Sequence, residues 1–280
     1  MSKTVKDGLN VAWYLVVFLL IQFAVNTAVV LATGAFQAAT GHTAMNSAVH
    51  GGAIFSGLTL TLTFAISGVF TALLFTRLRW TPVARTYLLS RPWAVIAWTA
   101  VLALGLILPS EFLQEQLDVL MPKELEQALT DALHEPTGFL AICIITPLAE
   151  EVVFRGAILR TLLTMFDRRW HWVSILISAV IFGLVHGNSA QLIHAIPMGM
   201  LLGWLYYRTD SLVPSVILHV INNSAAYIQA NLLPPTATDA KLIDLFQGSE
   251  QTTWLAVGFS LCIAIPALFQ LAIRLKKAKA

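Results

Sequence analysis

The chain has 280 residues, of which 57% are hydrophobic and 11% are charged, and its formal net charge is +2. Soluble domains carry roughly 25% charged residues, so this composition excludes an ordinary globular domain and indicates a polytopic membrane protein. The small net charge gives no indication of a nucleic-acid partner. The two cysteines, Cys143 and Cys262, lie in apolar runs and form neither a disulfide framework nor a zinc-type spacing.

Apolar runs follow one another along the whole chain. A helix needs about 20 residues to cross the hydrocarbon core, and eight runs reach or approach that length. The first is too long for the apolar part of a signal peptide, so we expect it to be a span. We therefore predict an all-α polytopic membrane protein, a single membrane domain over residues 1–280. Its eight expected spans are 9–34, 52–76, 92–109, 138–160, 172–190, 191–207, 212–232 and 252–273.

Lysine and arginine are distributed unevenly between the two sides of this arrangement. With a cytoplasmic N-terminus, fifteen of the seventeen fall on the cytoplasmic side, and only Lys123 and Lys241 fall outside. Positive charge accumulates in cytoplasmic loops. We therefore expect both termini in the cytoplasm and a multi-pass protein of the cell membrane, the cytoplasmic membrane if the source is bacterial.

Two polar connections are also predicted. The fifth and sixth spans nearly meet at Gly187 and Asn188, which requires a tight turn. The longest outer segment, residues 110–136, is predicted to form two short helices divided at Pro122. We expect the second of these to rest on the outer membrane surface or on other loops, and the alternative is a lid over a substrate.

The segment 146–156, TPLAEEVVFRG, places two glutamates and an arginine inside the fourth expected span. A charge near the bilayer centre costs at least about 2.5 to 3.5 kcal/mol, so these residues indicate a functional site. Glu151 and Arg155 are four residues apart on one helix face, which predicts an internal ion pair. Glu150 is rotated by about 100° from Glu151 and lacks that partner. We interpret Glu150 as the reactive carboxylate.

Further polar side chains occur in the next three spans: His186 in the fifth, and His219 with Asn223 four residues later in the seventh. A single His in a membrane helix is most often a packing residue, and we assign His194 in the sixth span to that class. The other residues together are difficult to place except around one hydrated cavity. We expect that cavity between the fourth, fifth and seventh spans.

This set of side chains suits hydrolysis of an acyl bond. Glu150 beside His186 could take a proton from water, and His219 with Asn223 could hold the oxyanion of the tetrahedral intermediate. Serine and threonine residues in the same helices have no obvious base to activate them as nucleophiles. The expected attacking group is therefore water.

Three sequence segments carry a resemblance to a known family: EEVVFRG at 150–156, FGLVH at 182–186 and HVINN at 219–223. They resemble the motifs E-E-x-x-x-R, F-x-x-x-H and H-x-x-x-N of the CPBP intramembrane proteases. That family includes type II CAAX prenyl endopeptidases and bacterial proteins linked to bacteriocin processing and immunity. The likeness covers residues 142–226, the expected catalytic core. It implies catalysis by Glu150, His186, His219 and Asn223, supported by Glu151 and Arg155.

Zinc is a possible cofactor, because Glu150, His186 and His219 are all possible ligands. The side chains next to the two histidines offer no acceptor for the second ring nitrogen, and no H-E-x-x-H pair occurs. We therefore expect glutamate-dependent hydrolysis without a cofactor, with zinc as the less favoured alternative.

The predicted function is that of an intramembrane endopeptidase in contact with membrane lipid, acting on a peptide or membrane-protein substrate. The alternative is a catalytically silent CPBP-like membrane adaptor or a bacteriocin-immunity protein. A transporter with a proton relay is a third hypothesis, which the absence of a detectable sequence repeat disfavours. The sequence leaves the substrate and the oligomeric state open.

Overall fold

The structure, a computed structural model, describes residues 2–40, 56–82, 86–117, 121–232 and 241–275. Over these residues every regular element is a helix, as the predicted fold class requires. The elements are α1 (Lys3–Thr40), α2 (Gly57–Arg77), α3 (Thr86–Leu89), α4 (Trp93–Gln116), α5 (Lys123–His134), η1 (Phe139–Ile145), α6 (Thr146–Glu151), η2 (Val152–Leu159), α7 (Arg160–Met165), η3 (Arg168–Trp170), α8 (His171–Leu184), α9 (Ser189–Thr209), α10 (Val213–Leu232), α11 (Leu242–Leu245) and α12 (Glu250–Arg274).

Four of the described helices, α1, α2, α4 and α12, are long and apolar enough to cross a membrane. A fifth candidate is α5 together with the helical stretch Phe139–Met165, which meet at a bend of 104°. Each of the eight predicted spans coincides with a helix or helical stretch. However, α8 is short, and α9 and α10 carry more polar side chains, so they are not candidates by the same measure. The count of eight spans and the cytoplasmic termini stay predictions.

The third predicted span is longer than expected, and this changes the outer segment. Helix α4 continues past Pro109 to Gln116, so residues 110–116 do not form a separate short helix. Proline is tolerated within membrane helices where neighbouring groups satisfy the freed backbone, and the Ser260 hydroxyl of α12 donates to the carbonyl of Gly105, four residues before Pro109, at 3.1 Å. The second predicted helix is present as α5, while 118–120 lie outside the described residues. The correction brings polar residues of α4 into the bundle.

The tight turn predicted between the fifth and sixth spans is confirmed. Gly187 adopts a φ of +71°, in the left-handed region that favours glycine after a helix end. Asn188 then caps α9, because its side-chain oxygen accepts the backbone N–H of Gln191 at 2.9 Å. Helices α8 and α9 therefore form a closely packed hairpin.

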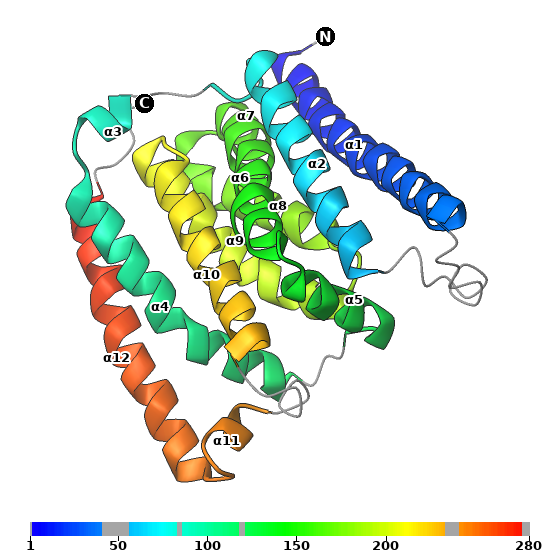
Figure 1. The fold of residues 1–280 in the computed structure, drawn as a ribbon. Coiled ribbons are helices and arrows are strands. Elements are labelled where there is room, and N and C mark those ends of the chain that lie inside the picture. The colour runs from blue at the N-terminus through cyan, green and yellow to red at the C-terminus, as the bar shows by residue number, and fades with distance from the viewer. Residues whose placement is uncertain (1, 41–55, 83–85, 118–120, 233–240, 276–280) are drawn as a thin grey trace.

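The helices are arranged with the motif-bearing elements in the middle of the bundle (Figure 1). Helices α1 and α2 lie side by side along one edge, and α4 packs beside α12 along the other. The second pair approaches closely at Gly105, where an added Cβ would lie 2.7 Å from the backbone nitrogen of Ala264. The stretch from η1 to α7, together with α8, α9 and α10, occupies the space between the two pairs.

Two apolar clusters hold this arrangement. One joins α1 and α2 to η2 and α8 through buried aromatic side chains such as Phe75, Phe154 and Phe182. The other joins α4, α9, α10 and α12 through aliphatic side chains that include Leu102 and Leu218. Because the motif helices contribute to both clusters, their polar faces are enclosed between the two outer helix pairs.

Candidate active site

The helical stretch that carries the two glutamates is not a regular α-helix. Segments of π-helix, η1 and η2, flank the single α-helical segment α6 that contains Glu150 and Glu151. The Thr146 hydroxyl donates to the carbonyl of Ala141, five residues earlier, at 2.9 Å. Wider π-type turns inside α-helices are frequent at functional sites because they alter the direction in which side chains project.

The ion pair predicted from the spacing is present. Arg155 Nη1 lies 2.9 Å from Glu151 Oε1, and both side chains are almost completely buried. Arg155 also donates from Nη2 to the carbonyl of Gly199 at 3.3 Å, and its guanidinium lies 4.5 Å from the centre of the Phe182 ring. The pair therefore connects η2 to α8 and α9 as well as balancing a buried charge.

His219 of α10 lies between the two glutamates. Its Nδ1 is 2.9 Å from Glu151 Oε1, and its Nε2 is 3.5 Å from Glu150 Oε2. The two carboxylates differ in their surroundings, since the Glu151 side chain is 0% exposed and that of Glu150 is 15% exposed. Glu151 thus joins Arg155 to His219 in the interior, whereas Glu150 faces open space.

His186 and Asn223 are held mainly by backbone groups. His186 Nδ1 lies 2.8 Å from the carbonyl oxygen of Phe182, one turn earlier. Because a carbonyl oxygen can only accept, Nδ1 carries the hydrogen and Nε2 of the neutral ring is an acceptor. Asn223 donates one amide hydrogen to the Ile142 carbonyl at 3.1 Å, which attaches α10 to η1. Its second amide hydrogen is available for another acceptor.

Glu150, His186, His219 and Asn223 line one cavity of about 330 Å³, here called the central cavity. His194, which we expected to be a packing residue, also lines this cavity. Further polar side chains that line the cavity come from one face of α4 and one face of α9. These additional residues are Ser110, Glu111, Gln114 and Gln191.

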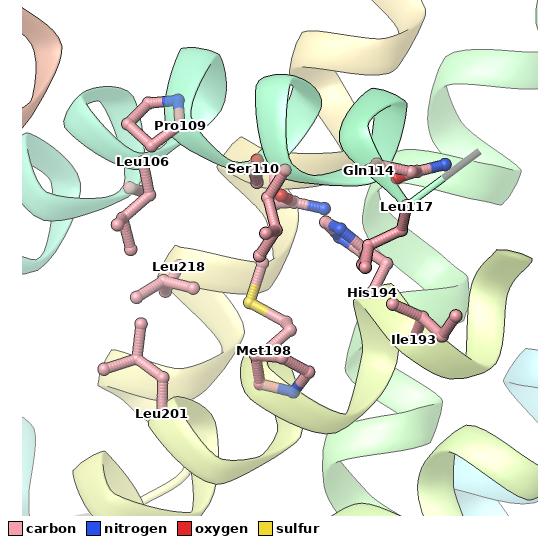
Figure 2. Close-up of a pocket in the computed structure, with 14 residues that line it drawn as sticks. Leu106, Pro109, Ser110, Gln114, Leu117, Ile193, His194, Met198, Leu201 and Leu218 are labelled. Carbon is pink, nitrogen blue, oxygen red and sulfur yellow. The ribbon is translucent and has the colours of Figure 1, made fainter. Parts of the chain in front are cut away.

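An apolar pocket of about 270 Å³ adjoins the central cavity between α4, α9 and α10 (Figure 2). Aliphatic side chains such as Leu106, Leu201 and Leu218 surround it, and His194 lies beside Gln114 near its other end. Ser110, Gln114, His194, Met198 and Asn222 line both spaces. The polar cavity is therefore continuous with a volume suited to an apolar segment.

Glu150, His186 and His219 are the possible zinc ligands at this site. Among the residues that the structure describes, no three His, Cys, Asp or Glu side chains form a group that could hold a metal ion. Both histidines nevertheless have an acceptor for Nδ1, which the side chains next to them in the sequence do not offer. These acceptors are Glu151 and the Phe182 carbonyl, one reached through tertiary packing and one from the backbone. Independence of metal stays a prediction.

Comparisons with known proteins match the central part of the chain. Residues 133–225 match the family described as type II CAAX prenyl endopeptidase Rce1-like. YdiL of Bacillus subtilis (strain 168), whose name attributes to it a membrane peptidase activity, is 29% identical over 123 residues, 42% of this chain and 49% of YdiL. The UPF0177 protein YaiF of Lactococcus lactis subsp. lactis (strain IL1403) is 27% identical over 107 residues, 38% of this chain and 45% of YaiF.

The chain spans about half the length of these curated relatives, and no solved structure matches it. The family match extends from α5 into α10 and includes every candidate catalytic and supporting residue. Helices α1, α2, α4 and α12 lie outside it. The resemblance predicted from the three motifs is thus confirmed: residues 133–225 of this membrane protein are similar to the family described as type II CAAX prenyl endopeptidase Rce1-like.

Proposed function

We propose that this protein is an intramembrane endopeptidase that hydrolyses a peptide bond with water activated by Glu150 and His186. The observation that carries the proposal is the position of His219 between two glutamates in a cavity that also contains His186 and Asn223. The Rce1-like family match and the name of YdiL support a membrane protease. The surrounding helices, apolar enough to cross a membrane, support a substrate within or beside the bilayer.

Glu150 is the proposed general base. The Glu150 carboxylate and the free Nε2 of His186 can accept the two hydrogens of one water molecule. As the water oxygen bonds to the carbonyl carbon, one proton passes to Glu150. The C–N bond then breaks, Glu150 returns the proton to the departing amine, and the products are a carboxylic acid and an amine.

His219 and Asn223 are proposed to stabilise the oxyanion. When His219 is protonated, Nδ1–H stays with Glu151, and Nε2–H, 3.5 Å from Glu150 Oε2, is available to the oxyanion once Glu150 has taken the proton from water. Asn223 has one amide hydrogen left after its bond to Ile142. Glu151 contacts His219 rather than the reacting atoms, so its proposed role is to position that ring.

The apolar pocket beside the central cavity supports an apolar peptide or membrane-protein segment as the substrate.

The alternative of a silent adaptor or immunity protein is not favoured. Binding alone does not require a carboxylate that faces a cavity next to a buried network of Arg155, Glu151 and His219. Hydrolysis gives each of these polar groups a function.

The test is to reconstitute the purified protein in liposomes with a pool of synthetic single-span peptides and to map new N-termini by mass spectrometry. Glu150→Gln should generate none of the new N-termini. The matched control is Glu126→Gln, an exposed carboxylate of α5, which should cleave like the unaltered protein. Failure of the unaltered protein to cleave any peptide, or equal cleavage by Glu150→Gln, would contradict the proposal.

A further inference from the structure

A third cavity, of about 510 Å³, lies on the other side of the candidate catalytic residues and is here called the α1–α2 cavity. Thr146, Glu150, His186 and Gln191 line both this cavity and the central cavity. In the fold, α1 and α2 lie on one side of α6, while α10 and α4 lie on the other (Figure 1). Glu150 and His186 therefore stand in a partition between two spaces.

The outer wall of the α1–α2 cavity carries polar side chains among apolar ones such as Phe18 and Leu60. Asn26 of α1 and Thr63 and Ser67 of α2 line it, within helices apolar enough to cross a membrane. The Thr63 hydroxyl donates to Asn26 Oδ1 at 3.4 Å. Ser67 is only 1% exposed, and its hydroxyl has no hydrogen-bond partner among the described residues. A buried polar group of this kind needs a partner, and the cavity is the space from which one can come.

Water is the ligand that fits these groups. Cavities lined by apolar atoms stay dry, whereas a cavity that offers several polar partners holds ordered water. The α1–α2 cavity offers hydroxyl and amide groups on its outer wall and a carboxylate and an imidazole on its inner wall. A water in this position can hydrogen bond to both walls and lie next to Glu150.

Hydrolysis also requires that water reach Glu150. Each cleaved peptide bond consumes one water, and a substrate in the central cavity would cover that face of Glu150. A hydrated space on the opposite face would supply the next water without passage past the substrate. The two cavities would then divide the two reactants between them.

We infer that the α1–α2 cavity is a water site, in which Asn26, Thr63 and Ser67 hold water against Glu150 and His186 while the substrate occupies the central cavity. The use of this water in hydrolysis rests on the proposed function, but the hydration of the cavity does not. Ser67 is a positioning residue in this scheme, since it acts on the water and does not contact the peptide.

Cysteine labelling tests hydration without any substrate. Ser67→Cys and Thr71→Cys are compared in a Cys262→Ala background, whose remaining Cys143 is buried and sets the blank. Thr71 is the matched control because it lies one turn further along α2, is buried, lacks a described partner and does not line the cavity. A small, permanently charged methanethiosulfonate reacts with thiolates, so Ser67→Cys should label at least about tenfold faster than Thr71→Cys. Equal, slow labelling would overturn the inference.

A second arm asks what occupies the cavity. Glu150→Gln protein carrying Ser67→Cys is saturated with a peptide that the unaltered enzyme cleaves, and the labelling is repeated. Labelling should persist, because the peptide lies in the central cavity. Loss of labelling would show the peptide in the α1–α2 cavity and would overturn the assignment to water.

The third arm separates water supply from substrate binding. Removing one hydrogen-bonding group should change the rate by up to about tenfold, so Ser67→Ala should lower kcat several-fold with KM within about twofold. Thr71→Ala should leave both constants unchanged, and thermal melting of each variant checks folding. A fall in kcat shared by Thr71→Ala would contradict the role of Ser67. Absence of all hydrolysis would refute the proposed function, whereas slow Ser67→Cys labelling in an active enzyme would refute only the water site.

Discussion

The central cavity and the α1–α2 cavity share Thr146, Glu150, His186 and Gln191 but differ in the other side chains that line them. His219 and Asn223 line only the central cavity, together with residues of α4 and an adjoining apolar pocket. Asn26, Thr63 and Ser67 line only the α1–α2 cavity. The candidate catalytic residues all lie within the Rce1-like match, while α1, α2 and α4 lie outside it. The proposed chemistry thus belongs to the matched region, and the unmatched helices contribute further walls to both cavities.

The largest effect on activity is expected from a change at Glu150, which lies between the two cavities. Glu150→Gln keeps the size of the side chain but removes the proposed base, which lines both cavities. General acid–base catalysis contributes about 10² to 10⁴-fold, so hydrolysis in liposomes should fall by at least 10²-fold. Thermal melting should be almost unchanged because Glu150 is not part of the buried Arg155 pair. A stable Glu150→Gln protein with full activity would show that another group is the base.

Glu151→Gln should instead destabilise the fold. It leaves Arg155 buried without a carboxylate, and breaking a buried pair costs about 3 to 5 kcal/mol. The same change weakens the acceptor of His219 Nδ1. Denaturant unfolding in detergent measures the loss, with Glu150→Gln as the neighbouring control. Equal stability of the two variants would remove the distinction between a structural and a reactive glutamate.

His194→Ala should affect only the central cavity. His194 lines that cavity and its apolar pocket but does not line the α1–α2 cavity. We expect KM to rise about threefold to tenfold, the effect of one lost hydrogen-bonding group, with little change in kcat. His134→Ala, an exposed histidine of α5, is the control. A fall in kcat without a change in KM would place His194 in the chemistry rather than in substrate binding.

The smallest effect is expected on metal removal. Equilibration with a chelator should leave the rate of peptide hydrolysis unchanged within measurement error. A catalytic zinc site needs three protein ligands, and the candidates are Glu150, His186 and His219. Recovery of activity specifically on adding zinc to inactive, stripped protein would overturn the prediction. It would also change the role of His219 from oxyanion donor to ligand.

Features set by short-range spacing could be predicted from the sequence. The Glu151–Arg155 pair follows from four residues on one helix face, and the turn at Gly187 and Asn188 from backbone preference and capping. The helical class follows from the long apolar runs, and the resemblance over residues 133–225 follows from three motifs in order. Each depends on residues close together in the chain, so periodicity contains the necessary information.

Only the tertiary structure decided which faces meet. His219 reaches Glu151 across 68 residues, and Asn223 reaches Ile142 across 81. The extension of α4 past Pro109, which brings Glu111 to the central cavity, depends on neighbours, as does the inclusion of His194. The partition at Glu150 exists because α1 and α2 pack opposite α4 and α10. A helix's own sequence indicates which face is polar, but the packing of several helices determines what that face contacts.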